Sequence, residues 1–162
     1  MLMMLSITLL LALGPLSPVT GDVICPPREL WSWCCYCEEY TDGVIAFRAN
    51  NELTSDDSVS DMLDMLLNTP GISPIGLLGI NQNLLTQVPY QTLLFPQLQE
   101  LDLKSNELTL IKSGTFNFPD KNNPLRKLDL FRQYTTLPLI IEPAAFLGTK
   151  SNLSNVIYLR SI

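Results

Sequence analysis

The sequence predicts an α/β solenoid: a short, curved parallel sheet with one strand per repeat, an irregular or helical convex side, and a disulfide cap at the N-terminal end. Three observations carry this prediction. An eleven-residue pattern of apolar residues recurs with starts near residues 75, 98, 125 and 153, a helical pattern precedes it, and four cysteines cluster ahead of both. Repeats with a period of roughly 20–29 residues cannot bury their apolar faces singly, so the core forms between neighbours.

The recurring pattern is L-x-x-L-x-L-x-x-N-x-L. It is complete in residues 98–108 and, with isoleucine at two positions, in residues 75–85, so that the two starts lie 23 residues apart. A third, degraded repeat begins at Leu125 with Gln133 in place of the asparagine, and a fourth begins at Leu153. The pattern resembles that of leucine-rich repeat proteins. This resemblance implies one strand per repeat, with leucines pointing into a shared core.

Other repeat residues are predicted to be structural. Asn83 and Asn106 occupy the ninth position of their patterns, where a side-chain amide can satisfy backbone groups that a sharp turn would leave buried and unpaired. Phe95, Phe116 and Phe146 recur on the far side of their units. We expect these rings to fill the core beneath the convex segments.

Between the cysteines and the first complete repeat, the pattern is that of a strand and then a helix. Residues 43–49 (GVIAFRA) are apolar and β-prone. From residue 56, apolar residues follow helical spacing, with Ser55 or Asp56 as the N-cap and residues 68–71 (NTPG) as the end. A calcium site built from Asp56, Asp57 and Asp61 is the weaker alternative, because the segment lacks the alternating oxygen ligands of known calcium loops.

The four cysteines predict two disulfides in an oxidising compartment. We expect a bond between adjacent Cys34 and Cys35 to be strained, which leaves Cys25 to bond one of them and Cys37 the other. Cys25–Cys35 with Cys34–Cys37 is marginally easier to close than the other option. Zinc is disfavoured because the chain has no histidine and no C-x-x-C spacing.

The motifs Cys25-Pro26 and Cys35-x-Cys37 resemble the N-terminal cap of extracellular leucine-rich repeat proteins. The resemblance implies that the cluster covers the first apolar edge of the solenoid. The usual fourth cysteine of that cap would lie near residues 47–49, whereas this chain has its additional cysteine at position 34. The disulfide map of the family is therefore not carried over.

The N-terminus predicts secretion. Residues 1–12 are almost all apolar and uncharged, too few for a membrane-spanning helix, and prolines follow at positions 15 and 18. We expect cleavage before Asp22, with an uncleaved anchor as the alternative, and no membrane insertion after cleavage. The expected organisation is a signal peptide (1–21), a Cys-rich cap with its strand (22–54), a capping helix and linker (55–74), and repeats (75–162), the last incomplete.

Composition argues against several function classes. A net charge of −6 disfavours nucleic acid and anionic membranes as partners. The absence of histidine removes the commonest general base, and no Gly-rich phosphate loop is present, so we expect neither catalysis nor a cofactor. Asp102 and Asp129 occupy equivalent repeat positions, and a carboxylate pair there is the remaining catalytic alternative. We favour a solvated acidic ladder, balanced by neighbouring cations.

The predicted function is recognition of an extracellular protein, or a glycan-bearing one, through the concave face of the sheet, whose outward positions have no core duty. Phe131 beside Arg132 has the composition of an interaction hot spot, unless its ring folds back onto the degraded turn. The residues expected on this face are Leu77, Asp102, Lys104, Lys127, Asp129, Phe131 and Arg132. The sequon at Asn152 is a candidate glycosylation site. The apolar strand at residues 153–159 predicts self-association or a partner at the C-terminal edge.

A narrower resemblance rests on residues 59–74, 85–89 (LTQVP) and 113–118 (SGTFNF). These segments look like those of secreted leucine-rich repeat proteins of arthropods, particularly crustaceans, and the similarity covers about residues 22–150. Some members of that group are described as the non-catalytic subunit of a secreted luciferase complex. The resemblance thus implies an alternative function, a scaffold subunit of a secreted enzyme complex attached through the C-terminal edge.

Overall fold

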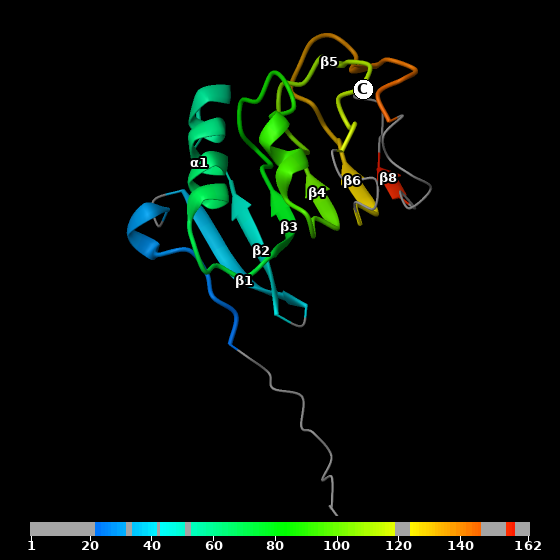
Figure 1. The fold of residues 1–162 in the computed structure, drawn as a ribbon. Helices are drawn as coiled ribbons and strands as arrows, with labels where there is room; N and C mark the ends of the chain where they lie inside the picture. The colour runs from blue at the N-terminus through cyan, green and yellow to red at the C-terminus, as the bar shows by residue number, and fades with distance from the viewer. Residues whose placement is uncertain are drawn as a thin grey trace, which may run out of the picture.

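The computed structural model describes residues 22–31, 34–41, 43–50, 53–118, 124–146 and, for the backbone alone, 155–157. Its main feature is a six-stranded sheet in the order β1-β2-β3-β4-β6-β8 (Figure 1). β1 is antiparallel to β2, and the other neighbours are parallel. The strands are β1 (Cys35–Thr41), β2 (Val44–Ala49), β3 (Ile75–Gly79), β4 (Glu100–Asp102), β6 (Lys127–Asp129) and β8 (Asn155–Ile157). The fold is therefore mixed α/β with a mostly parallel sheet.

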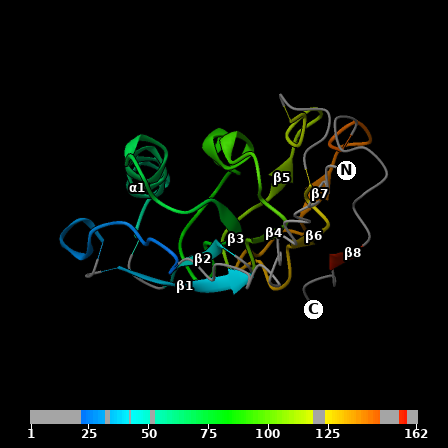
Figure 2. The ribbon, with the colours of Figure 1, turned by 60° about the horizontal axis from the view of Figure 1, so that its bottom comes forward.

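One side of this sheet carries most of the remaining elements. Figure 2 shows α1 and a short helical turn above the sheet, followed along the same side by a small second sheet. The elements are α1 (Asp56–Asn68), the 3-10 helices η1 (Arg28–Leu30) and η2 (Tyr90–Leu94), and the paired strands β5 (Leu110–Ile111) and β7 (Ile140–Ile141). Of the helices, α1 and η2 thus cover one face of the large sheet, while η1 lies beside its β1 edge. We call the opposite face the open face.

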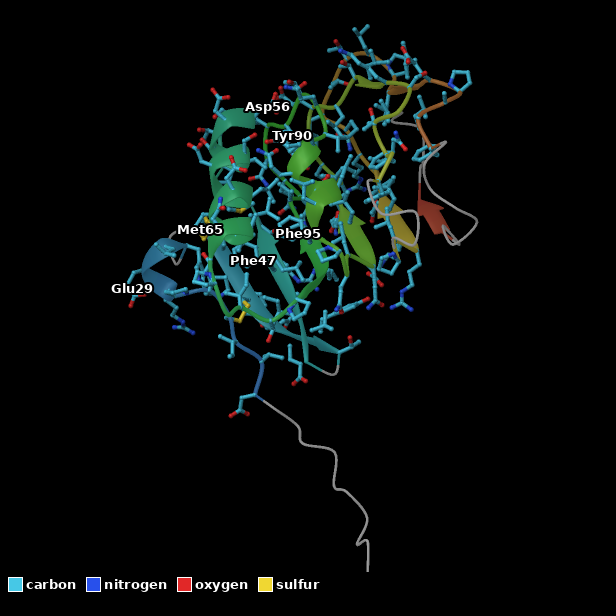
Figure 3. The ribbon with its side chains drawn as sticks, viewed as in Figure 1. Glu29, Phe47, Asp56, Met65, Tyr90 and Phe95 are labelled. Atoms are coloured by element: carbon cyan, nitrogen blue, oxygen red, sulfur yellow. A yellow bond between two sulfur atoms is a disulfide. The ribbon has the colours of Figure 1, made fainter. Side chains whose placement is uncertain are left out.

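The core lies between the large sheet and the elements that cover it. Leu78, Leu101 and Leu128 occupy one row across β3, β4 and β6, and all three are fully buried. Phe47 and Phe95 fill the same space from β2 and from the end of η2 (Figure 3). Because side chains alternate between faces along a strand, the residues on either side of this row point to the open face.

The rings predicted to fill the core do so. Phe95 and Phe116 are buried, and Phe146 is partly buried and stacks on Phe116 with 5.1 Å between ring centroids. These contacts confirm the interpretation of the recurring phenylalanines as packing residues.

The predicted helix forms at the expected place. The Ser55 side chain accepts a hydrogen bond from the backbone N–H of Ser58 at 3.1 Å, so Ser55 is the N-cap of α1. The helix buries Val59 and three further apolar side chains, and it ends at Asn68. Gly71 follows with a φ of +76°, a conformation that favours glycine.

The turns after β3, β4 and β6 repeat one backbone conformation. Gln82, Ser105 and Arg132 have φ angles of 59°, 56° and 50° respectively, in the left-handed region that non-glycine residues rarely adopt. Each directly precedes the residue at the asparagine position of its repeat. The same turn therefore recurs in all three repeats.

The side chain after each left-handed residue completes this turn. The side-chain oxygens of Asn83, Asn106 and Gln133 accept the backbone N–H of Leu53, Leu85 and Leu108 at 3.1, 3.2 and 3.1 Å. Each side-chain nitrogen donates to a backbone carbonyl in the preceding unit and to a backbone carbonyl at the end of its own strand. The structural role predicted for both asparagines is confirmed. The third turn, which the sequence indicated to be degraded, keeps the same bonds with glutamine.

The disulfides differ from the expected pairing. Cys25 bonds Cys37, with 6.1 Å between their Cα atoms, and Cys34 bonds Cys35. The favoured pairs Cys25–Cys35 and Cys34–Cys37 are therefore wrong. Both Cys34 and Cys35 donate their backbone N–H to the carbonyl of Trp31, so Cys34 lies in a turn just before β1. Adjacent side chains in a turn are not forced to opposite faces, as they are in a strand.

The capping region also contains more regular structure than expected. The sequence predicted only the strand now seen as β2, whereas β1 adds an antiparallel edge strand that carries Cys35 and Cys37. The signal peptide, its cleavage point and the sequon at Asn152 lie outside the described residues. Within the described ranges, no helix has the length and apolar character needed to cross a membrane.

Candidate functional site

The open face of the sheet bears a hollow of about 230 Å³. The register places Leu77, Glu100 and Lys127 in one row, and Gly79, Asp102 and Asp129 in the next. The hollow lies over these rows and is lined by Arg48, Leu77, Glu100, Leu101, Asp102, Lys104, Lys127 and Asp129. Five of the seven residues predicted for this surface therefore lie together.

Glu100 is the centre of a polar network that sequence reasoning missed. Its carboxylate accepts hydrogen bonds from the Tyr40 hydroxyl at 2.8 Å and from the Lys127 ammonium at 3.1 Å. Arg126 donates to the Tyr40 oxygen at 3.0 Å and lies 3.9 Å from the carboxylate. The network ties β1 to β4 and β6.

The network changes the pKa values of its members. Partial burial alone would raise the pKa of Glu100, but the hydrogen bonds from Tyr40 and Lys127 outweigh it and hold this pKa below its usual value. Burial raises the pKa of Tyr40, and the nearby Glu100 adds to this effect. Glu100 is therefore ionised and Tyr40 protonated at neutral pH.

Asp102 and Asp129 stand in register, as predicted, but each has a structural role. One carboxylate oxygen of Asp102 accepts the backbone N–H of Lys104 at 3.1 Å, and the equivalent oxygen of Asp129 accepts that of Phe131 at 3.0 Å. The other Asp102 oxygen accepts from Asn81 and pairs with the Lys104 ammonium at 3.2 Å. Both aspartates thus fix the chain as it leaves its strand, and substituting them would disturb the turns.

Phe131 and Arg132 form a pair at the end of this surface. The guanidinium of Arg132 lies over the Phe131 ring, 5.0 Å from its centroid, in the geometry of a cation–π contact. Phe131 is half-buried and Arg132 is exposed. Neither residue lines the hollow. Together they supply an aromatic edge and a positive charge beside it.

The open face is not uniformly accessible. Leu77 lines the hollow but is only 7% exposed, so it forms part of the floor and offers little surface to a partner. Arg48 extends over Gly79, because a Cβ atom added there would lie 3.2 Å from its Cγ, and it pairs with Glu38 at 3.6 Å. Arg48 and Glu100 were not among the predicted residues. Arg48 is the neighbour of buried Phe47 in β2, and Glu100 is the neighbour of buried Leu101 in β4. Alternation of side chains between the two faces of these strands is the signal that would have placed both residues on the open face.

The acidic start of α1 is engaged within the chain. The Asp56 carboxylate accepts the backbone N–H of Thr86 at 2.9 Å and also the Thr86 hydroxyl. This contact ties the helix to the first repeat, and Figure 3 shows Asp56 at the helix end facing that side. Within the described ranges, no three His, Cys, Asp or Glu side chains are grouped so that they could hold a metal ion.

The open face can therefore offer a partner fixed charges of both signs around a shallow hollow, with one aromatic side chain at its end. Its carboxylates are already hydrogen-bonded, which suits them to complementary contact more than to proton transfer. No protein-family model, curated protein or solved structure matches this chain.

Proposed function

We propose that the chain is a secreted leucine-rich repeat solenoid that binds an extracellular macromolecule through its open face. The fold assignment is supported by the parallel ladder with one strand per repeat and by the turn bonds that recur at Asn83, Asn106 and Gln133. Two disulfides and no free cysteine among the described residues are compatible with an oxidising compartment.

One observation carries the functional proposal. The row Leu78, Leu101 and Leu128 is buried in the core, while the flanking rows place charged side chains around a hollow on the other face. Charged residues arranged in this way give orientation and selectivity to an interface, and an aromatic residue such as Phe131 supplies contact area.

The proposal is tested by capture from native extracellular fluid with the mature chain, residues 22–162. The test variant combines Lys104→Glu with Phe131→Ala, because neither side chain has a role in the turns comparable to those of the aspartates. The matched control combines Lys112→Glu with Tyr90→Ala, which are again one charge reversal and one aromatic-to-alanine change, at exposed positions away from the open face.

We expect the parent and the control to retain a common partner, and the open-face variant to lose it. Circular dichroism of both variants establishes that they are folded. A partner held equally by all three proteins would contradict recognition through the open face.

A second candidate is a non-catalytic scaffold subunit of a secreted enzyme complex. It is favoured by Tyr134, Leu137 and Ile140 in the third repeat, whose side chains are 61%, 63% and 59% exposed. Ile140 belongs to β7, which pairs on one side with β5. Under this function, Leu137→Asp with Ile140→Asp would release a captured enzyme that the open-face variant still holds.

A further inference from the structure

β1 is the longest strand of the described residues, and it forms the edge of the large sheet. An edge strand pairs with only one other strand, so the backbone N–H and C=O groups of every second residue point away from the sheet. Which residues these are follows from β2. Ile45 donates its backbone N–H to Pro74, on the β3 side, at 2.9 Å. Ile45 therefore makes no ladder bond with Glu39, the residue opposite it in β1.

The direction of the backbone groups alternates along β2, and this alternation identifies the outward residues of β1. Ala46 and Arg48 direct their backbone groups to β1, where they face Glu38 and Tyr36. The backbone groups of Cys35, Cys37 and Glu39 point outward. The N–H of Cys35 is taken by the Trp31 carbonyl. Two outward N–H groups and three outward carbonyls have no other backbone partner within the described ranges, enough for a short added strand.

The side chains along this edge select the chemistry of such a strand. Tyr36 is 52% exposed, the Glu38 carboxylate is partly exposed, and Glu39 is exposed. The Tyr36 hydroxyl donates to the Glu38 carboxylate at 2.7 Å, and this hydrogen bond raises the pKa of Tyr36. Tyr36 is neutral in this contact, so it does not offset the negative charge of Glu38. Successive side chains of β1 point to opposite faces of the sheet, so Glu38 lies on the open face, where Arg48 already pairs with it, and Glu39 lies on the other face. A strand that carries Lys or Arg at alternate positions would place its cations on one face, beside the exposed Glu39.

A second copy of the chain fits this edge less well. Pairing β1 with itself would bring four glutamates onto one short ladder, between chains that each carry a net charge of −6. Such charges on an edge strand oppose self-association while leaving the backbone available to a basic segment.

From these observations we propose that the outer edge of β1 is a strand-addition site for an extended basic peptide segment of a partner protein. The added strand bonds to the outward groups of Cys37 and Glu39 and to the Cys35 carbonyl, and its cations lie on the face of the sheet that carries the Glu39 carboxylate. This site lies at the opposite end of the sheet from Phe131 and Arg132, and it does not depend on the function proposed for the open face.

The test uses the disulfide-bonded mature chain, labelled for amide NMR, and a capped hexapeptide of alternating lysine and valine. Two control peptides separate backbone from charge: a fully N-methylated version with the same charge, and a version with glutamate in place of lysine. The first peptide is expected to slow the exchange of the Cys37 and Glu39 amides. The Tyr36 and Glu38 amides are protected by β2 before the peptide is added.

Two substitutions at one residue divide the effect further. Glu39→Pro removes an outward N–H without touching the β1–β2 ladder, and it is expected to weaken peptide binding by about tenfold or more, since a lost bond leaves a buried acceptor unpaired. Glu39→Gln keeps the N–H and removes the charge, and it is expected to weaken binding about two- to fivefold. Lys104→Glu with Phe131→Ala should leave peptide binding unchanged.

Equal binding of the N-methylated peptide would overturn the proposal, because charge alone would then explain the contact. Unchanged exchange at Cys37 and Glu39 at millimolar peptide would overturn it as well. Protection of these amides without peptide, together with a doubled mass in solution, would assign the edge to a second copy instead. The peptide comparison remains decisive even if Glu39→Pro alters the fold of β1.

Discussion

The hydroxyl of Tyr40 donates to the carboxylate of Glu100 at 2.8 Å, a contact that joins residues 60 positions apart. Replacing Tyr40 with phenylalanine should lower the free energy of unfolding by about 1 kcal/mol, because the ring remains but Glu100 and Arg126 lose a partner. Urea unfolding measures the change. Tyr36→Phe is the control, since its hydroxyl bonds at an exposed position, and it should change stability by less than about 0.5 kcal/mol.

Gly76 makes room for the Tyr40 ring. A Cβ atom at this position would lie 2.5 Å from Val44 Cγ1 and 3.0 Å from Tyr40 Cδ1. Gly76→Ala should therefore cost about 1–3 kcal/mol of stability, and part of this loss should vanish in the background of Tyr40→Ala. At Gly79, the nearest atom to an added Cβ is Arg48 Cγ at 3.2 Å, so Gly79→Ala should cost less. Equal losses at the two glycines would contradict this explanation.

The glutamine of the third turn should matter as much as the asparagine of the second. Asn106→Ala and Gln133→Ala each leave one buried N–H and at least two carbonyls without their side-chain partner. Each should cost about 2–4 kcal/mol in denaturant unfolding. Asn117→Ala, at an exposed position, should stay within about 0.5 kcal/mol of the parent. A small effect at Gln133 alone would mean that the third turn is held by other contacts.

Glu100 should make stability depend on pH in the acid range. Its pKa is below the ordinary value of 4.5 in the folded state, so ionisation stabilises the fold. This contribution is fully present above pH 4.5 and is lost as the pH falls through the lowered folded pKa. Unfolding measured from pH 6 to pH 2.5 should show a smaller acid loss for Glu100→Gln than for the parent. An identical pH profile would show that Glu100 is not responsible.

The two disulfides should contribute unequally to stability. Cys25–Cys37 closes a segment with a sequence separation of 12, and removing it should cost about 3 kcal/mol by the chain-entropy estimate. Cys34–Cys35 joins neighbours and closes almost no loop, so its removal should cost far less. The measurement compares paired Cys→Ala variants in thermal unfolding, after peptide mapping of the parent. Mapping that recovers Cys25 linked to Cys34 or Cys35 would contradict the pairing itself.

Local patterns in the sequence were sufficient for much of the fold. The spacing of leucines and asparagines located β3, β4 and β6, because the same residues that define the pattern fill the core and close the turns. The cap at Ser55 and the stop near Asn68 located α1 for similarly local reasons.

Other features depended on contacts between distant parts of the chain. Alternation along β4 places Glu100 on the open face but does not reveal its polar network, since Tyr40 reaches it only after the β1–β2 hairpin has folded against the repeats. The disulfide pairing depended on the turn at Trp31, which places Cys34 outside β1. Leu77 lies on the open face but is only 7% exposed, because neighbouring side chains cover it. Alternation along one strand does not reveal such neighbours.

The side chains of Asn83, Asn106 and Gln133 give the array a direction. Each satisfies polar groups in the unit before it, so every unit relies on its successor for hydrogen bonds that it does not make itself. Peeling away a later unit exposes orphaned backbone amides and carbonyls in the one that stays behind. Removing an earlier unit instead leaves the side-chain amide of the next unit without its partner, and this amide can rotate into water at a lower free-energy cost. Fraying of the repeats should consequently be easier from the N-terminal end than from the C-terminal end. The slowest-exchanging amides should lie in units that have a neighbouring unit on each side.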